Sequence, residues 1–166
     1  MQVKALASKG FYYDSLKAVQ RLKKHSTKYE LNSTLLRMAG EEVRLTKKED
    51  ASYAYLRKVE GQVDVVSNRL QEEVQAELLH AAVFGNTHVL YKKEHKAHEA
   101  LTQKVKEDCI DTPEPTSLKA RYFHNNIRLA YFSSKEDNES AFQQSEKLIQ
   151  LVTNNEVLWL EQPLIL

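Results

Sequence analysis

The sequence predicts an all-α protein, and three observations support that prediction. Apolar residues recur at spacings of three and four along most of the chain, as they do on one face of an α-helix. The 166 residues include only four Gly and three Pro, and most of these helix breakers fall between the periodic segments. With 42% hydrophobic and 28% charged residues, the composition is typical of a helical protein with a real core. We therefore expect one helical domain over residues 1–166.

The first third of the chain predicts two helices. One extends over about residues 12–29 and starts just after Gly10. Its apolar face would consist of Tyr12, Leu16, Val19 and Leu22. The second extends over residues 30–45, with Asn32 or Ser33 as a plausible N-cap. Its apolar face would consist of Leu31, Leu35, Met38 or Ala39, and Leu45.

The middle of the chain predicts a long helical segment without proline, over residues 46–84. Thr46 is a possible cap, and Gly61 is expected to mark a kink or a change of packing partner. Its apolar residues are Leu56, Val59, Val63, Val66, Leu70, Val74, Leu78, Ala81 and Ala82. Gly85-Asn86 then predicts a turn, and a further helix over about residues 89–108 is charged and His-rich, so we expect it to be more exposed.

A proline-containing loop at residues 111–117 precedes a predicted helical hairpin. Thr116 or Ser117 would cap the first helix, residues 118–133. Its apolar residues are Leu118, Tyr122 or Phe123, Ile127, Ala130 and Tyr131. Beyond a short charged turn at residues 135–139, the apolar face of the second helix would consist of Ala141, Ser145, Leu148 and Val152, widened by Phe142 and Ile149. Two helices joined by so short a turn must lie antiparallel.

Two turns of the chain share one pattern of residues. Gly10 is followed two positions later by the aromatic Tyr12 and five positions later by the small Ser15. In the second turn the corresponding residues are Glu136, Asn138 and Ala141. A small residue at the fifth position lets the second helix of a hairpin approach the first closely. Since these are the offsets of a tetratricopeptide-type hairpin, the sequence indicates a helical repeat.

With these motifs the chain resembles the TPR-like (tetratricopeptide-type) helical repeat proteins, and more narrowly an uncharacterised TPR-like group common in Bacteroidetes. The segments that match that group are residues 122–126, 129–132, 136–141, 147–149 and 155–156. The resemblance is best over residues 120–163 and weaker over residues 10–45. It implies a TPR-like α-solenoid of antiparallel helix hairpins, about six or seven helices in all, which binds proteins on a concave face.

Both ends of the chain predict a further neighbour. Residues 1–9 amount to about half of a first helix, and residues 156–166 are almost entirely apolar. A solenoid normally ends in a helix with a polar outer face. We therefore expect either that the chain is a fragment of a longer solenoid or that it self-associates through its apolar C-terminus, with Trp159 touching the neighbour.

The sequence offers no candidate for catalysis. His95 and His98 would share one helix face and could hold a metal together with a third ligand, but the neighbouring lysines oppose a cation, so a helix without metal is the favoured interpretation. Cys109, the only cysteine, has no flanking motif and is expected to be a buried or incidental thiol. The glycines stand alone, which leaves no phosphate-binding loop. We expect no enzyme activity and no cofactor.

The favoured function is a non-catalytic protein–protein interaction or scaffold module. Tyr13, Asn125 and Asn126 could line its groove for a protein or peptide partner, although capping of a neighbouring turn is the simpler role for the asparagines. An alternative is a ligand- or nucleic-acid-responsive regulatory domain whose basic cluster, residues 21–28, contacts phosphate. A solvated helix face is the simpler interpretation of that cluster, and the net charge of +1 argues against a nucleic-acid partner. A metal-dependent helical enzyme that uses His95 and His98 is a third alternative.

We expect a cytoplasmic protein without a membrane partner. A single cysteine forms no internal disulfide, which favours a reducing compartment. The N-terminal residues contain no apolar core of signal-peptide length. No segment approaches the roughly 20 consecutive apolar residues of a membrane-spanning helix.

Overall fold

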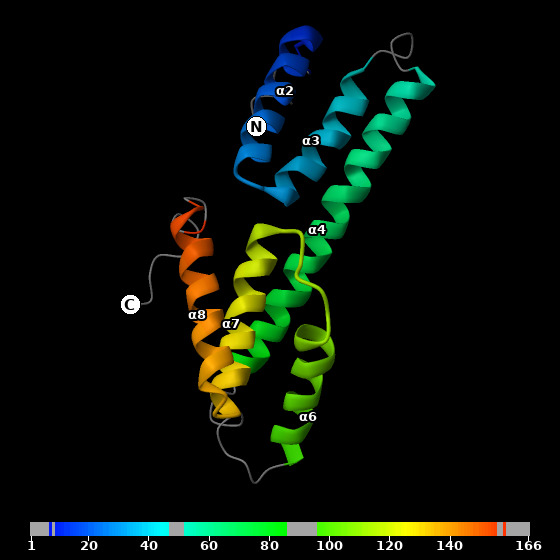
Figure 1. Cartoon of the computed structure of the whole chain (residues 1–166). Helices are drawn as coiled ribbons and strands as arrows, with labels where there is room; N and C mark the ends of the chain where they lie inside the picture. The colour runs from blue at the N-terminus through cyan, green and yellow to red at the C-terminus, as the bar shows by residue number, and fades with distance from the viewer. Residues whose placement is uncertain (1–6, 8, 47–51, 86–95, 156–157, 159–166) are drawn as a thin grey trace. The chain divides into compact units, whose positions relative to one another are not determined.

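The computed structural model of the chain describes residues 7, 9–46, 52–85, 96–155 and 158. In these residues it contains six α-helices and one π-helical turn, and no β-strand (Figure 1). The elements are α2 (Tyr12–Lys28), α3 (Asn32–Leu45), α4 (Tyr53–Gly85), α6 (Lys96–Val105), η1 (Lys106–Ile110), α7 (Leu118–Ser134) and α8 (Asn138–Thr153). The prediction of an all-α fold is confirmed.

The contacts within the chain divide it into two compact units. The first unit comprises residues Met1–Leu70, with α2, α3 and the first part of α4. The second comprises Gln71–Leu166, with the rest of α4, α6, η1, α7 and α8. One helix, α4, thus contributes to both units. The expectation of one domain over residues 1–166 stays a prediction.

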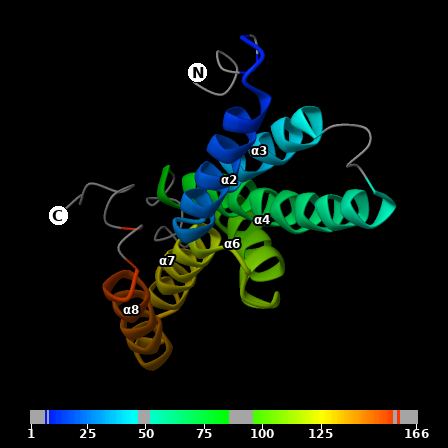
Figure 2. The ribbon, with the colours of Figure 1, turned by 90° about the horizontal axis from the view of Figure 1, so that it is seen from above.

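Each unit contains a pair of consecutive helices that lie side by side, α2 with α3 and α7 with α8 (Figures 1 and 2). In the first pair, Glu30 follows α2 in a left-handed conformation, with φ at 47°. The N–H groups of Glu30 and Leu31 donate to the carbonyls of Thr27 (3.3 Å) and Ser26 (2.9 Å). This is the Schellman motif, which satisfies the last carbonyls of a helix and reverses the chain.

The turn between α7 and α8 has the same construction. Glu136 is left-handed, with φ at 61°, and the N–H groups of Glu136 and Asp137 donate to the carbonyls of Ser133 (3.2 Å) and Phe132 (3.1 Å). Asp137 then caps α8, because its carboxylate accepts from the N–H of Ser140 at 3.1 Å. The charged turn at residues 135–139 therefore contains the N-cap of α8.

The predicted equivalence of Gly10 and Glu136 extends to the backbone. Gly10 is also left-handed, with φ at 82°, and in each turn a helix begins two residues later, at Tyr12 and Asn138. Glycine enters this conformation freely, whereas a residue with a Cβ meets a steric cost there. The two turns therefore share a backbone shape although only one of them contains glycine.

The core of the first unit is small. It consists of Ala7, Val19, Met38 and Leu45, with Leu16 and Ala18 packed against it. The prediction that Tyr12 and Leu22 also face the core is wrong, since both side chains are exposed. The buried face of α2 is narrower than the sequence predicts because, among the described helices, α2 packs mainly against α3. The small Ser15 of α2 is fully buried.

The core of the second unit surrounds α7. It consists of Leu79, Val83, Val105, Cys109, Ile127 and Ala130, with Leu101, Ile110 and Tyr131 packed against it. The predicted core face of α7 is confirmed, with Leu118, Phe123, Ile127 and Ala130 all buried. Helices α4, α6 and α8 and the η1 turn all contact α7, which explains why no α7 side chain is exposed.

Helix α4 does not keep one apolar face along its length. The predicted stripe is wrong at Val74 and Leu78, which are 50% and 67% exposed, and the buried residues there are Leu79 and Val83. Val59 is the buried residue of the first part of the helix. The buried face changes because α4 packs against different neighbours in the two units. Gly61 lies within the continuous helix.

Two predicted helix caps have other roles. Thr46 ends α3, where its hydroxyl donates to the carbonyl of Glu42 at 2.8 Å. Ser117 precedes α7, but its hydroxyl bonds to Glu73 of α4 and caps no helix N–H group. Predictions from the sequence place a hydroxyl next to a helix end, and they do not show which acceptor it will find.

Two further surface predictions require correction. Phe142 and Ile149 were expected to widen the core face of α8, yet they are 64% and 61% exposed. His98 was expected on an exposed helix, yet it is buried. Asn86 and His95 lie outside the described residues, as do the predicted turn after Gly85 and the start of the predicted helix at residue 89.

Candidate interaction surfaces

The predicted partner-binding residues lie in different surroundings. Tyr13 on α2 is 70% exposed, and the Lys17 ammonium lies over its ring, 4.3 Å from the centroid. Asn125 on α7 is 4% exposed, and its amide donates to Glu114 at 3.3 Å. Asn126 is half-buried and donates to the Tyr122 carbonyl of its own helix at 3.0 Å. Trp159 lies outside the described residues. Their roles in binding a partner stay predictions.

Only one histidine of the predicted metal pair lies among the described residues. His98 is described and buried, whereas His95 is not described. In residues 7, 9–46, 52–85, 96–155 and 158, no three His, Cys, Asp or Glu side chains come together in a group that could hold a metal ion.

Cys109 belongs to the core of the second unit and has polar neighbours there. This residue lies in the π-helical turn η1, is fully buried, and its thiol donates to the carbonyl of His124 at 3.6 Å. Burial raises the pKa of the thiol to about 12, against a smaller opposing effect of the Arg128 charge. A thiol that stays protonated at neutral pH is a poor nucleophile. The prediction of a buried Cys109 is confirmed.

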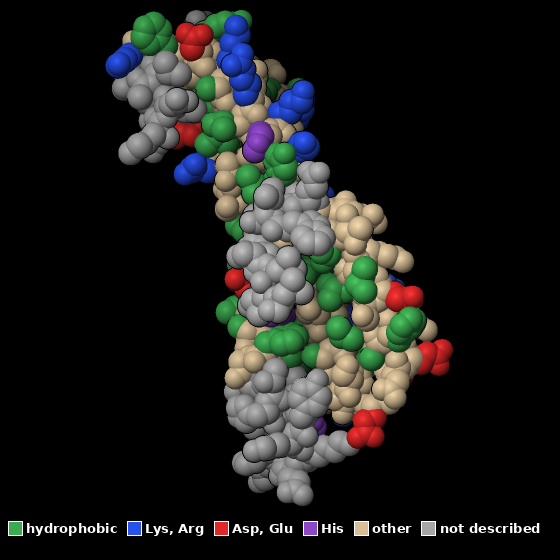
Figure 3. Space-filling model, turned by 90° about the vertical axis from the view of Figure 1, so that its left-hand side faces the viewer, with side chains coloured by type: hydrophobic (Ala, Val, Ile, Leu, Met, Phe, Trp, Pro, Cys, Tyr) green, Lys and Arg blue, Asp and Glu red, His purple; other side chains and the backbone are tan. Residues whose placement is uncertain are grey.

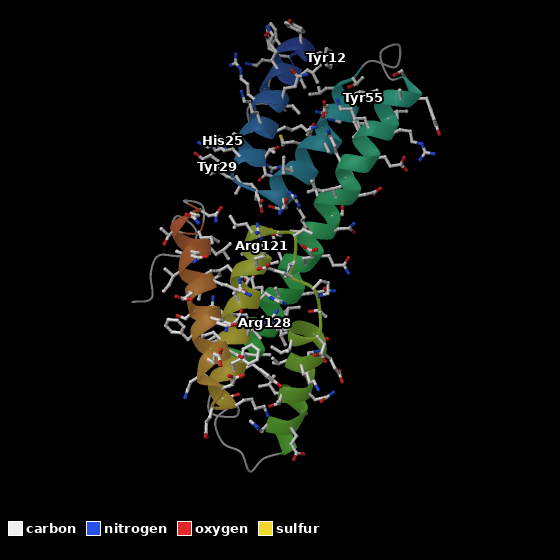
Figure 4. All side chains as sticks on the ribbon, in the orientation of Figure 1. Tyr12, His25, Tyr29, Tyr55, Arg121 and Arg128 are labelled. Atoms are coloured by element: carbon white, nitrogen blue, oxygen red, sulfur yellow. The ribbon has the colours of Figure 1, made fainter. Side chains whose placement is uncertain are left out.

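The imidazole of His124 is buried beside this thiol. By distance and angle, neither of its ring nitrogens has a hydrogen-bond partner among the described residues. Burial lowers its pKa, and so does the Arg128 guanidinium, while the Cys109 backbone and the Glu114 carboxylate act in the opposite direction. Arg121 and Arg128 lie two turns apart on α7 (Figure 4), and the Nε atom of each is buried without a partner. This cluster keeps His124 neutral and offers no nucleophile with a base beside it.

The charges of the chain are divided unequally between the two units. Residues 1–70 contain 14 Lys and Arg against 8 Asp and Glu, a formal net charge of +6, whereas residues 71–166 contain 10 against 15, a net charge of −5. The overall charge of +1 conceals this asymmetry. Figure 3 shows Lys and Arg side chains around α2, and hydrophobic side chains with acids at their border over α8. Opposite charges in two parts of one chain indicate interaction surfaces of different kinds.

The positive charge of the first unit is concentrated in what we call the α2 cation row. Its members are Lys17, Arg21, Lys24 and Lys28. They are spaced by four, three and four residues, which places them on one helix face over about 16 Å. All four are exposed, and none makes an ion pair with a residue that the structure describes.

Aromatic side chains mark both ends of the α2 cation row. Lys17 lies over Tyr13 at one end, and the Lys28 ammonium lies 5.0 Å from the ring centroid of Tyr29 at the other. The Tyr29 ring also contacts His25, with centroids 4.6 Å apart (Figure 4). These contacts place the two end cations against aromatic rings at the surface.

A further lysine of α2, Lys23, differs from the row because its charge is neutralised by an ion pair. Lys23 turns away from the row, forms an ion pair with Glu42 of α3, and donates to Gln62 of α4 at 3.0 Å. Both members of the ion pair are largely buried. Lys23 thus links three helices of the first unit.

The second surface is the α8 outer face. Its members are Glu139, Phe142, Glu146 and Ile149, which are spaced by three, four and three residues and so lie on one side of α8. All four are exposed, and neither acid has an ion partner in the described part of the chain. Large exposed apolar side chains bordered by charge are typical of protein interaction sites.

The sequence contains signals for both surfaces that the predictions did not use. The basic cluster was identified as the contiguous residues 21–28, which includes Lys23 and omits Lys17. The spacing of four, three and four residues places Lys17, Arg21, Lys24 and Lys28 on one helix face and leaves Lys23 off it. A separate count of net charge for residues 1–70 and residues 71–166 reveals the unequal division of charge.

The chain matches no protein family, no curated protein and no solved structure. No helix in the described part of the chain is both long enough and apolar enough to cross a membrane.

Proposed function

We propose that the chain is a non-catalytic helical interaction module that binds an acidic protein surface through the α2 cation row. The observation that carries this proposal is the row itself, four exposed cations on one helix face with no ion partner among the described residues. Like charges so close to one another repel, so an acidic partner gains attraction and also relieves that repulsion.

The surroundings of the α2 cation row favour a protein partner over a nucleic acid. The exposed Tyr13 lies against Lys17, the first member of the row, and apolar contact adds to charge at protein interfaces. The second unit carries a net charge of −5, which repels a long polyanion. The +6 charge of the first unit supports nucleic-acid binding as the second candidate, which the experiment below separates.

The helical architecture supports display of a surface rather than chemistry. The chain reversals after α2 and after α7 are both Schellman turns, and short reversals between successive helices are what a TPR-like solenoid requires. We propose such an arrangement for the whole chain, in agreement with the resemblance of residues 10–45 and 120–163. The only cysteine is protonated at neutral pH and fully buried, which supports a module without a thiol nucleophile.

Two labelled probes test the proposed function. One is a helical peptide that carries Glu and Phe or Ile in turn along one helix face, at spacings of three and four residues. The other is a single-stranded DNA oligonucleotide. Fluorescence anisotropy is measured for the wild type, for Lys17→Glu/Lys24→Glu, and for the control Arg57→Glu/Lys58→Glu, which makes the same charge change at exposed sites on α4. We expect the peptide to bind wild type and control equally and the row variant at least about tenfold more weakly.

Two results would overturn this proposal. If the peptide binds the row variant as tightly as the wild type, the α2 cation row is not the binding surface. If the oligonucleotide binds the wild type more tightly than the peptide does, and its affinity falls steeply with salt, the row binds nucleic acid.

A further inference from the structure

The α2 cation row and the α8 outer face are complementary in charge and in spacing. Lys17 and Lys24 are seven residues apart on α2, and Glu139 and Glu146 are seven residues apart on α8. Seven residues correspond to two helical turns, or about 10.5 Å, in both elements. Two helices placed side by side could therefore form both ion pairs at once.

The apolar residues of the α8 outer face have suitable contacts on α2. Phe142 and Ile149 are also seven residues apart and alternate with the two acids. Lysine and arginine side chains have long aliphatic stems that cover apolar groups while their charges remain in water. On α2 the exposed Tyr13 adds an aromatic ring at one end of the row. A helix that carries cations on long stems is thus a partner that fits both the acids and the apolar pair.

We infer that the α8 outer face of one copy of this chain binds the α2 cation row of a second copy, so that the protein self-associates head to tail. The inference rests on the proposed function, since it identifies the acidic protein surface as a second copy of the chain. The self-association predicted from the apolar C-terminus with Trp159 involves other residues, which lie outside those described.

The interface is heterologous, because each copy contributes two different surfaces. A heterologous contact leaves one surface of each kind unused at the ends, so association continues beyond the dimer unless the copies close into a ring. A single pair of helix faces belongs to the smallest class of protein interfaces, which is typical of transient contacts. We therefore expect association that is weak, concentration-dependent and sensitive to salt, since both ion pairs are exposed.

Sedimentation velocity from low micromolar to millimolar concentration tests the inference. For the wild type we expect the weight-average mass to rise with concentration and to fall again when salt is added. Lys17→Glu/Lys24→Glu and Glu139→Lys/Glu146→Lys should each weaken association at least about tenfold. The matched control Arg57→Glu/Lys58→Glu should behave as the wild type does, and circular dichroism checks that every variant is helical.

Mixing the two charge-reversed variants provides the decisive measurement. One then presents an acidic α2 row and the other a basic α8 face, so the equimolar mixture should regain the association that each variant has lost. The inference is overturned if the wild type is monomeric at every concentration, if either variant associates as the wild type does, or if the mixture stays monomeric.

The two proposals fail in different ways. A monomeric wild type that still binds the Glu-rich peptide through the α2 cation row removes the second copy as partner and leaves the proposed function intact. A row variant that binds the peptide as tightly as the wild type removes the proposed function itself.

Discussion

The left-handed Glu136 is the residue with the clearest local cost. Its φ of 61° is a conformation that glycine enters freely and that costs other residues roughly 1 kcal/mol. We predict that Glu136→Gly will be more stable than Glu136→Ala by about 1 kcal/mol, because both substitutions remove the same side-chain interactions and only glycine removes the steric cost. Urea unfolding of the two variants measures the difference. Equal stability would mean that the turn is not strained.

The buried His124 predicts a dependence of stability on pH. The neutral imidazole is favoured in the folded protein, so its pKa lies below the unfolded value of about 6.5. The unfolded chain then binds more protons as the pH falls below about 6.5, and stability is lost in that range and is complete above it. At about pH 5.5 the loss from one such histidine is at most about 1.4 kcal/mol.

The test compares the pH dependence of two proteins rather than their absolute stabilities. We predict that the free energy of unfolding of the wild type falls between about pH 7.5 and pH 5.5, and that His124→Gln reduces this fall. His80 continues to contribute in the variant, because burial also lowers its pKa. A variant that loses as much stability as the wild type would show that His124 is not the group responsible.

At the scale of elements, α7 is held at its N-terminus by α4. One carboxylate oxygen of Glu72 accepts from the N–H of Thr116 (2.9 Å), the hydroxyl of Thr116 (2.9 Å) and the N–H of Ser117 (3.0 Å). This negative charge also lies where the helix dipole favours it. Helix α7 therefore starts from an anchor that is 44 residues away in the sequence.

We predict that Glu72→Ala will destabilise the protein by about 1–3 kcal/mol, because it removes the common acceptor of three hydrogen bonds. The control is Glu77→Ala on the same helix, which removes one exposed ion pair with Lys119 at 3.4 Å and should cost less than about 1 kcal/mol. Thermal or urea unfolding of both variants measures the difference. Similar losses for the two would argue against the anchor.

The sequence predicts the elements of this chain better than it predicts which sides of them are covered. The helices over residues 12–29, 30–45 and 118–133, and a further helix beyond the turn at residues 135–139, follow from periodicity, since apolar spacing is a local property. On α8, however, Leu148 and Ile149 are consecutive residues on adjacent sides of the helix. Periodicity alone does not show which of these two sides packs against α7. Val74 and Leu78 were mispredicted for the same reason, because the neighbours of α4 differ along its length.

The candidate surfaces could be predicted only in part. Tyr13 was identified as a contact residue and is indeed exposed, but its position at the end of a cation row depends on α2 being a helix with Lys23 on the other side. The acids and apolar residues of the α8 outer face could not be recognised as a surface while Phe142 and Ile149 were assigned to the core.

At the scale of the whole molecule, the division of charge predicts how the protein behaves on ion exchangers. With +6 in residues 1–70 and −5 in residues 71–166, we predict that the native protein is retained at low salt by both cation and anion exchangers near neutral pH. Lys17→Glu/Lys24→Glu should abolish retention on the cation exchanger. The equally charged Arg57→Glu/Lys58→Glu should reduce it less, because those residues lie outside the α2 cation row.

The two variants have the same net charge, so any difference in retention reports the placement of the charges. Identical elution on the cation exchanger would show that the row is not a concentrated positive surface.

The two Schellman turns have a consequence for how such a chain tolerates mutation. Glu30 and Glu136 occupy positions that usually require glycine, and the main-chain hydrogen bonds around them are nevertheless complete. Chain reversal is therefore encoded mainly in the backbone and only weakly in the side chain at the turn. A residue other than glycine at such a turn therefore keeps the hairpin at a modest energetic cost, while the glycine that would mark the turn in the sequence is absent.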